Sequence, residues 1–265
     1  MRTGIIFAAA AMAAVAALGD APGSVTNKNG DIQKGMVRWS ARDKAYVIAR
    51  EGVELQVKAS EVSELNIDKP AGFDQAVEKV NGKKDVASAI PVLDKIVKSY
   101  RRLQWDIVAG RYLAQAYLAT GKPDAALQAC QDIIATDSSA AYKGDLAPAY
   151  WSSLLALGKT TQLEMALDRA FKTGDRYSSG AAFIVRGDMI MKDGNESPDA
   201  ARKALTDGYL RVVLLYKDEK IAPKLRPEAL YKAARCFDKL QHAGRQQAML
   251  DDLKRNYPQS PWAAE

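Results

Sequence analysis

The sequence is poor in the residues from which catalytic and metal sites are built. Its 265 residues include a single histidine, His242, and two cysteines. Zinc sites and Ser–His nucleophilic arrangements need a histidine held by partner side chains, and the sequence around His242 offers neither a nucleophile nor a second ligand. Cys-x-x-Cys pairs, paired-histidine motifs and glycine-rich phosphate loops are absent as well. We therefore expect no enzymatic activity, no cofactor and no metal site.

Long apolar runs are also rare, and the clearest one lies at the beginning of the chain. Arg2 is followed by an alanine-rich apolar run from Ile5 to Leu18 and then by small residues. This layout predicts a secretory signal peptide over residues 1–19, because the run is shorter than the roughly 20 apolar residues that a membrane span needs. We expect an exported protein, periplasmic or associated with the cell envelope, with no transmembrane span after signal cleavage.

The positive charge of the chain is not concentrated in one stripe. The formal net charge is +6, from 38 Lys and Arg against 32 Asp and Glu, and most of the excess is spread thinly along the chain. Nucleic-acid binding needs a clustered basic surface. We therefore expect no nucleic-acid partner, and we assign the diffuse charge to solvated faces.

The segment after the signal region has strand-like patterning. Residues 20–29 are small and polar, which predicts a flexible lead-in. Residues 30–69 contain short β-branched and aromatic runs separated by turn residues, and residues 53–57 alternate between apolar and polar side chains. We expect a small β-domain over residues 30–69, with the SH3-like barrels as one candidate fold.

This β-domain carries the sharpest local charge of the chain. Its five basic residues are Lys34, Arg38, Arg42, Lys44 and Arg50. Because Trp39 and Tyr46 lie among them, the segment has a composition that suits an acidic peptide, a glycan or a nucleic acid. Strand alternation would place Arg38 and Trp39 on opposite faces, which favours Trp39 in the core and the cations on a solvated face.

From residue 73 onward the apolar positions repeat with a helical spacing, and the period is 37 residues. The three triplets that show it are Ala89, Leu93 and Ile96, then Ala126, Cys130 and Ile133, then Leu163, Leu167 and Ala170. The four-then-three spacing places each triplet on one stripe of a helix, and a period of this size is typical of stacked helical pairs. Cys130 fills a core position far from Cys236, so we expect two free, buried thiols.

The fourth unit departs from this period. Its first helix, expected over residues 181–192, contains Arg186-Gly187-Asp188, which matches a cell-adhesion tripeptide but lacks the exposed loop that adhesion requires. The unit slips by one residue, and its second helix, expected over residues 198–216, is unusually long. Residues 217–226 are expected to form an exposed loop, and a fifth helical pair follows.

The spacing resembles that of the tetratricopeptide repeat family. The residues that carry the resemblance are Leu113, Ala114, Tyr117, Gly121, Ala126 and Ile133, and later Ala234, Phe237 and Tyr257-Pro258-Gln259-Ser260-Pro261. The later group is similar to the terminal repeats of exported bacterial envelope members. The resemblance implies five helical pairs over residues 73–262 and a mainly α-helical solenoid preceded by the small β-domain.

In this family, ligands usually lie in a concave groove lined by the first helix of each pair. Carried over to this chain, the resemblance implies that the groove includes Asp74, Glu78, Arg111, Gln115, Ser152, Asp188, Tyr231 and Arg235. Mixed charge with one aromatic residue suits a polar peptide segment or a partner helix. We expect a non-enzymatic scaffold that binds protein partners in the bacterial envelope. The alternatives are a module that binds cell-wall glycan or another anionic polymer through the β-domain, and an enzyme with a perturbed carboxylate in a deep pocket.

Overall fold

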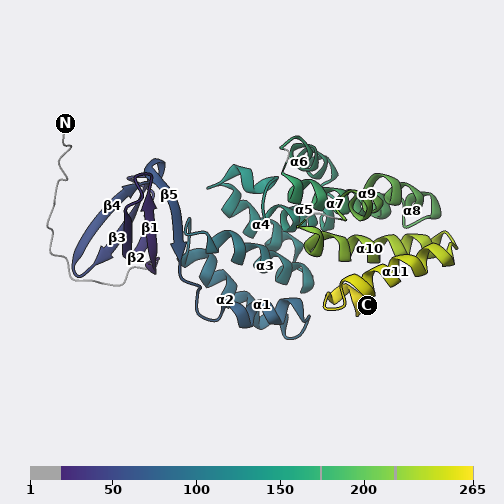
Figure 1. The fold of residues 1–265 in the computed structure, drawn as a ribbon, viewed down its shortest axis with the longest axis horizontal. Coiled ribbons are helices and arrows are strands. Elements are labelled where there is room, and N and C mark those ends of the chain that lie inside the picture. The colour runs from purple at the N-terminus through teal and green to yellow at the C-terminus, as the bar shows by residue number, and fades with distance from the viewer. Residues whose placement is uncertain (1–18, 174, 218–219, 265) are drawn as a thin grey trace. The chain divides into compact units, whose positions relative to one another are not determined.

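The structure, a computed structural model, describes residues 19–173, 175–217 and 220–264. These residues form two compact units, one that ends at Leu113 and one that begins at Ala114. The chain is mainly α-helical, with an antiparallel sheet followed by helical pairs, so the predicted fold class is confirmed (Figure 1). The expected signal peptide lies outside the described residues except for Gly19. Within the described ranges, no helix is both long and apolar enough to cross a membrane.

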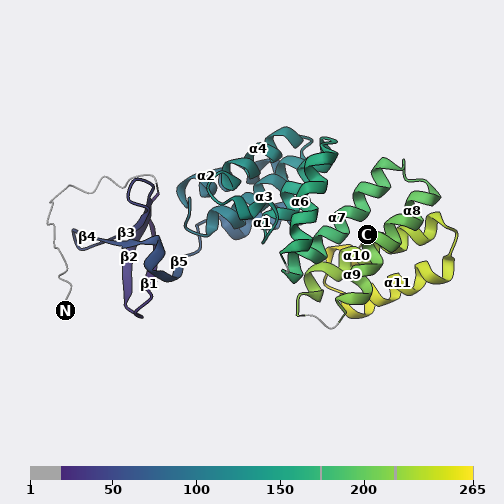
Figure 2. The ribbon, with the colours of Figure 1, turned by 90° about the horizontal axis from the view of Figure 1, so that it is seen from above.

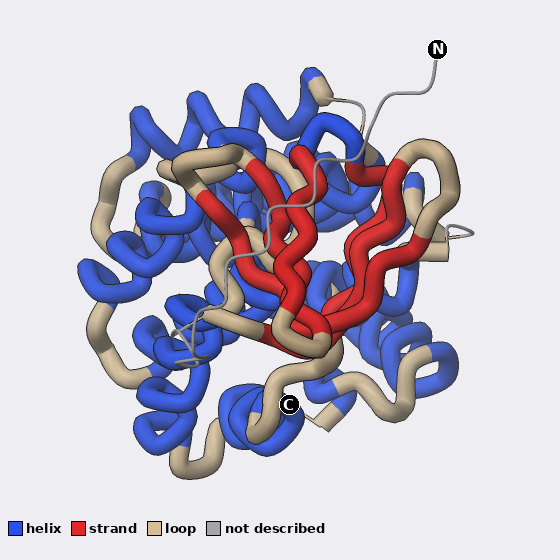
Figure 3. The backbone as a smooth tube through the Cα atoms, turned by 90° about the vertical axis from the view of Figure 1, so that its left-hand side faces the viewer, coloured by secondary structure: helices blue, strands red, loops and turns tan. Residues whose placement is uncertain are grey.

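The first unit opens with a five-stranded antiparallel sheet (Figure 3). Its strands are β1 (Ala21–Asn27), β2 (Ile32–Ser40), β3 (Ala45–Arg50), β4 (Val53–Lys58) and β5 (Val62–Ile67). They lie in the order β4-β3-β2-β1-β5, so the last strand returns to pair with the first. A short 3-10 turn, Ala59–Glu61, separates β4 from β5.

The prediction of a flexible lead-in over residues 20–29 is wrong. Residues 21–27 form β1, which pairs with β2 on one side and with β5 on the other. Ala21 and Val25 are fully buried on the same face of this strand. The small, polar composition hid the strand, because its order comes from pairing with two neighbours and not from its own side chains.

One face of the sheet shares its core with the segment that joins two helices of the same unit. Val37, Ile48 and Ile67 pack around the fully buried Leu103. The indole Nε1 of Trp105 donates a hydrogen bond to the Ile67 carbonyl at 2.9 Å. The sheet and the following helices therefore belong to one compact unit, which also contains α1 (Phe73–Asn81), α2 (Val86–Ser99) and the beginning of α3 (Trp105–Ala119).

The second unit consists of helices joined by short turns. After the end of α3 come α4 (Pro123–Ile134), α5 (Ala147–Ala156), α6 (Thr160–Lys172), α7 (Arg176–Asp193), α8 (Pro198–Ala204), α9 (Leu210–Leu215), α10 (Ala222–Lys239) and α11 (Ala243–Asn256). Helices α10 and α11 lie side by side as one hairpin (Figure 2). Every member of the three sequence triplets is at most 4% exposed, which confirms their core register. Both cysteines are free and buried, as predicted.

The long helix of the fourth unit contains a π-helical turn, Leu205–Tyr209, between α8 and α9. The 37-residue period predicts buried residues at Ala200, Ala204 and Asp207, but the third buried position is Gly208. A π turn takes up one extra residue per turn. This turn therefore accounts for the shift of the third buried position from 207 to 208.

The expected loop over residues 217–226 is wrong in its second half. Helix α10 begins at Ala222, and Arg226 is only 3% exposed. Its guanidinium donates hydrogen bonds to the Val213 carbonyl, the Tyr257 hydroxyl and the Asp252 carboxylate. The local run of charges predicts a segment exposed to solvent. Arg226 is buried instead, because partners distant in sequence accept its hydrogen bonds.

Candidate functional site

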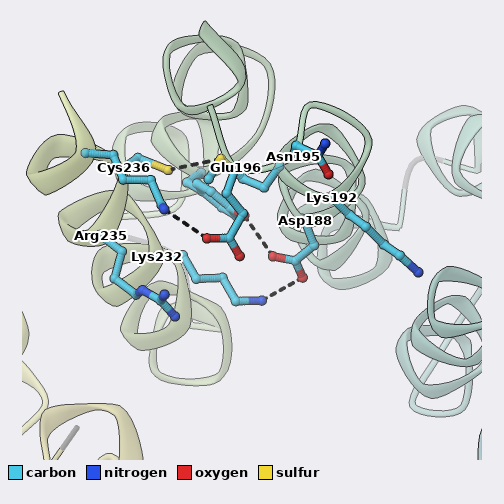
Figure 4. Close-up of a pocket in the computed structure, with 10 residues that line it drawn as sticks. Asp188, Lys192, Asn195, Glu196, Lys232, Arg235 and Cys236 are labelled. Carbon is cyan, nitrogen blue, oxygen red and sulfur yellow. Dashed lines mark hydrogen bonds and ion pairs between the residues drawn. The ribbon is translucent and has the colours of Figure 1, made fainter. Parts of the chain in front are cut away.

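A pocket of about 610 Å³ lies in the second unit between α7 and α10. Its lining residues are Asp188, Met191, Lys192, Asn195, Glu196, Tyr209, Lys232, Arg235, Cys236 and Lys239 (Figure 4). Besides Tyr209 and Cys236, six of these ten side chains are acidic or basic. We call this site the α7–α10 pocket.

An ion-pair network forms the inner wall of the α7–α10 pocket. The Lys232 ammonium lies 2.6 Å from Asp188 Oδ2 and 2.6 Å from Glu228 Oε1. The Tyr209 hydroxyl donates a hydrogen bond of 2.8 Å to Asp188 Oδ1. Figure 4 shows the charged ends of Asp188 and Lys232 pointing toward each other from the two helices. The side chains of Lys232 and Asp188 are 19% and 26% exposed, so the pair is shielded from most of the solvent.

The local sequence explains how these groups meet. Glu228 and Lys232 are four residues apart on α10, the spacing that places two side chains on one helix face. Tyr209 ends the π turn, and its ring lies directly against Gly187 of α7. A Cβ atom on Gly187 would lie 2.5 Å from Tyr209 Cε1. Glycine at 187 is therefore required for Tyr209 to reach Asp188.

The protonation states follow from burial and from the neighbouring charges. Burial raises the pKa of the Asp188 carboxyl, although Lys232 acts in the opposite direction. Burial by itself lowers the pKa of Lys232, but Glu228 and Asp188 outweigh it and the net pKa is raised. Burial and the adjacent Asp188 raise the pKa of Tyr209 as well. Lys232 is therefore a permanent cation near neutral pH, and Tyr209 remains a hydrogen-bond donor.

This geometry anchors Asp188 and does not free it for proton transfer. Both of its carboxylate oxygens are occupied, one by Tyr209 and the other by Lys232. A general base needs an oxygen within hydrogen-bond reach of the proton that it abstracts. The pKa of Asp188 is thus raised by burial, and the hydrogen bonds of the network that joins α7, the π turn and α10 act against that shift.

The rim of the pocket offers donors for a ligand. Lys239 pairs with Glu196 at 2.9 Å, and Lys192 Nζ donates hydrogen bonds to the carbonyls of Leu155 and Ala156. Arg235 is exposed and forms no hydrogen bond or ion pair with the residues that the structure describes. Its guanidinium, with five N–H donors, is the uncommitted cation of this rim.

The structure brings some of the predicted groove residues together. Asp188 and Arg235 both line the α7–α10 pocket. Tyr231 and Arg235 line a neighbouring pocket of about 400 Å³, where the Tyr231 ring lies 5.3 Å from that of Trp262. Gln115 and Ser152 are half-buried on α3 and α5 and line neither pocket.

The remaining predicted groove residues belong to the first unit. Asp74 is exposed and pairs with Lys69 at 2.8 Å. Glu78 is exposed on α1, and the Arg111 guanidinium lies 5.0 Å from the Tyr112 ring centroid. The inclusion of all eight residues in a single groove stays a prediction.

Sequence reasoning missed Lys232, Glu228 and Tyr209. The i, i+4 spacing of Glu228 and Lys232 is a signal that could have identified the pair as one helix face. No sequence signal points to Tyr209, because its position depends on the π turn and on Gly187.

The basic residues of the β-domain do not form one uniform surface. Arg38 donates to both carboxylate oxygens of Glu54, at 2.9 and 3.0 Å, and Arg50 lies 3.4 Å from Glu51. Arg38 pairs with Val47 across β2 and β3, so these two residues lie on the same face of the sheet. Arg50 is three residues after Val47 on β3 and therefore lies on the opposite face. Of the five basic residues, three are exposed and form no ion pair with any described residue. These are Lys34, Arg42 and Lys44.

Trp39 is half-buried in the first unit. Its ring packs edge-on against Tyr46, with centroids 5.1 Å apart, and the Arg102 guanidinium lies 4.8 Å from the ring centroid. The expected core position of Trp39 is therefore met in part, by an aromatic neighbour and a cation.

Comparison with known proteins identifies one part of the second unit. Residues 228–260 match the tetratricopeptide repeat family, and this stretch covers most of α10 and all of α11. No curated protein and no solved structure gives a significant match to the chain. The match supports a tetratricopeptide repeat, a class of helical hairpin that typically serves as a non-catalytic scaffold for protein–protein interaction.

Proposed function

We propose that this chain is an exported, non-enzymatic scaffold that binds a protein partner in the bacterial envelope through the α7–α10 pocket. The observation that carries the proposal is a charged pocket on the helix that begins the matched repeat, α10. The Asp188–Lys232–Glu228 network fixes the inner wall, so that little side-chain entropy is lost there when a ligand binds. Arg235 supplies an uncommitted donor at the rim.

The chemistry of the pocket favours an extended polar segment of the partner. The lining holds two carboxylates and four cations, and the apolar contribution comes mainly from Met191 and Cys236. A purely apolar helix would leave these charges desolvated and imperfectly paired, which costs affinity. A segment with carbonyl or carboxylate groups facing Arg235 satisfies them.

Site-specific photocrosslinking in the native cell tests this proposal. A photoreactive residue is introduced at Asn195 or at Arg235, with Ala248 as a control, because Ala248 is exposed on α11 and lines neither the α7–α10 pocket nor its neighbour. We expect the same partner adduct from both pocket positions and none from the control. In the Asn195 photoreactive protein, Arg235→Glu should remove the adduct. An adduct that survives this substitution, or that forms equally at Ala248, contradicts the proposal.

Export is tested separately on the mature protein. We expect the chain in the envelope fraction, with an amino terminus produced by cleavage near residue 19. Recovery of the intact N-terminal run in the cytosolic fraction would refute export without affecting the pocket assignment.

A second candidate function is binding of cell-wall glycan or another anionic polymer by the β-domain. It is favoured by Lys34, Arg42 and Lys44, which are exposed and have no ion pair in the described chain. The full chain should then be retained on purified cell wall, and reversal of these three charges to Glu should release it. Reversal of Lys143, Lys159 and Lys203, which are also exposed, gives a control of equal net charge. Equal loss in both triple variants would reduce the effect to general electrostatics.

A further inference from the structure

We propose that the second unit carries a second binding site, on α5 and α6, for a partner-protein segment that presents an aromatic side chain next to a carboxylate. The site shares no residue with the α7–α10 pocket. A test of this second site therefore does not depend on the function proposed above.

The site is a pocket of about 510 Å³, within the range typical of ligand pockets. Its lining residues are Ala141, Tyr142, Tyr150, Gln162, Met165, Ala166, Asp168, Arg169 and Lys172. Most of them lie on α6, and the rest come from the segment before α5 and from α5 itself. We call it the α6 pocket.

The apolar part of the α6 pocket is left open to solvent. Met165 is 68% exposed, which is unusual for a large apolar residue in this chain. Tyr142 and Tyr150 are half-buried beside it. Methionine adapts its shape to different ligands, and tyrosine rings provide rigid contact area. These three side chains together suit an aromatic side chain of a partner.

The polar part of the pocket carries uncompensated positive charge. Asp168 is already engaged, because the Arg186 guanidinium lies 3.4 Å from its carboxylate. Arg169 stacks over the Tyr142 ring at 5.1 Å. Neither Arg169 nor Lys172 forms an ion pair with any described residue. A ligand carboxylate can therefore pair with two cations of the same pocket that have no carboxylate partner among the described residues.

The position of these residues on α6 separates them from the core. Leu163, Leu167 and Ala170 point inward and are at most 1% exposed. Met165, Arg169 and Lys172 follow the same four-then-three spacing two residues later, on a different face of the helix. The packing of the helical repeat uses the other face of α6 and does not require the α6 pocket. We therefore assign the pocket to the binding of a partner. Complementarity of charge points to an acidic protein segment as that partner.

Methionine methyl resonances offer a test in the full chain. The probe is the blocked peptide acetyl-Gly-Phe-Glu-Glu-Gly-amide, added to protein labelled with ¹³C at the methionine methyl groups, up to about 2 mM to detect weak affinity. We expect a saturable shift of the Met165 methyl and no comparable shift of Met191, which lines the α7–α10 pocket. The Met165 resonance is assigned with Met165→Leu.

Two changes to the peptide and two to the protein complete the test. Replacing Phe by Ala in the peptide, or both Glu by Gln, should lower its affinity by about tenfold or more, as followed by the Met165 shift. The Arg169→Glu/Lys172→Glu variant should bind the probe at least about tenfold more weakly, and Arg169→Gln/Lys172→Gln should follow the same direction. Lys143→Glu/Lys159→Glu, a control of equal charge at exposed residues outside the pocket, should keep affinity within about twofold.

Several outcomes would overturn the assignment. These are no shift of Met165 at any concentration, equal shifts of Met165 and Met191, or undiminished binding in both pocket variants. Phenylacetate that binds as tightly as the peptide would also overturn it, because the occupant would then be a small aromatic acid and not a protein segment.

Discussion

Helices α4 to α6 and helices α7 to α10 both pack as neighbouring pairs, but they fill their contacts with different chemistry. From α4 to α6 the buried positions are apolar apart from Ser153, as in Ala126, Cys130 and Leu167. Between α7 and α10 the contact includes Asp188 and Lys232, a shielded ion pair. The first region keeps the 37-residue period, and the second one loses it at the π turn.

The difference shows what a departure from the period makes possible. A regular helical face at α8 and α9 would continue the apolar stripe through position 207. The π turn instead brings Tyr209 toward α7, where it meets Asp188. π turns within α-helices occur frequently at functional sites. In this molecule the irregular repeat also contributes to the α7–α10 pocket.

The largest expected effect comes from removing the cation of the network. Lys232→Met leaves the Asp188 and Glu228 carboxylates facing each other without their shared partner. We expect the free energy of unfolding to fall by about 3 kcal/mol. The loss should grow as the pH rises from 4 to 7, because burial raises the pKa of the Asp188 carboxyl, the variant lacks the Lys232 cation that acts against this shift, and stability is lost as the carboxyl ionises. Urea denaturation at both pH values measures this change.

Lys203→Met is the matched control for this prediction. Lys203 lies exposed on α8 and makes no side-chain ion pair in the described chain. We expect a change within about 0.5 kcal/mol. Equal destabilisation by the two substitutions would show that the α7–α10 contact does not depend on its ion pair, and the comparison between the two regions would lose its basis.

A smaller effect is expected from filling the close approach between α7 and the π turn. A Cβ atom on Gly208 would lie 2.8 Å from Gly187 Cα and 2.8 Å from the Phe183 carbonyl oxygen. These are backbone atoms that cannot rotate away, so Gly208→Ala should cost about 1–3 kcal/mol of stability. Thermal or urea unfolding measures the cost.

Gly244→Ala provides the opposite result within the matched repeat. Gly244 lies near the start of α11, and a Cβ atom there meets no atom within 4 Å. Because alanine favours a helix more than glycine does, we expect a gain of up to about 0.5–1 kcal/mol. If Gly208→Ala were equally harmless, the packing of Gly187 against Gly208 would not be what holds the π turn.

The sequence predicts the regular part of the fold because its signals there are local. The apolar triplets identify the inward faces of α2, α4 and α6 without reference to any distant residue. Gly121 and Gly158, with φ values of 72° and 66°, end the helices before their partners, where the sequence places them. These signals depend on helical periodicity and on backbone sterics alone.

The parts that sequence reasoning missed depend on partners far along the chain. Strand β1 is ordered by β2 and β5 together, and Arg226 is buried by residues 26 and 31 positions later. The site divides in the same way. Asp188 and Arg235 are implied by the family resemblance, whereas Tyr209 reaches Asp188 only through the π turn.

The two thiols give the finest test of the comparison, since each one lies in a different region. Burial alone raises the pKa of Cys130 to about 12. Burial and Asp188 raise the pKa of Cys236, but Arg235 and Lys239 act against them, so that it reaches about 11. The thiolate is the reactive form, and one pKa unit corresponds to about a tenfold difference in its population. Because a thiolate of lower pKa is also less nucleophilic, we expect iodoacetamide at pH 9 to alkylate Cys236 about threefold faster than Cys130, as followed by peptide mass spectrometry, and both to react alike in denaturant. Faster alkylation of Cys130 would contradict the expected lowering of the Cys236 pKa by Arg235 and Lys239.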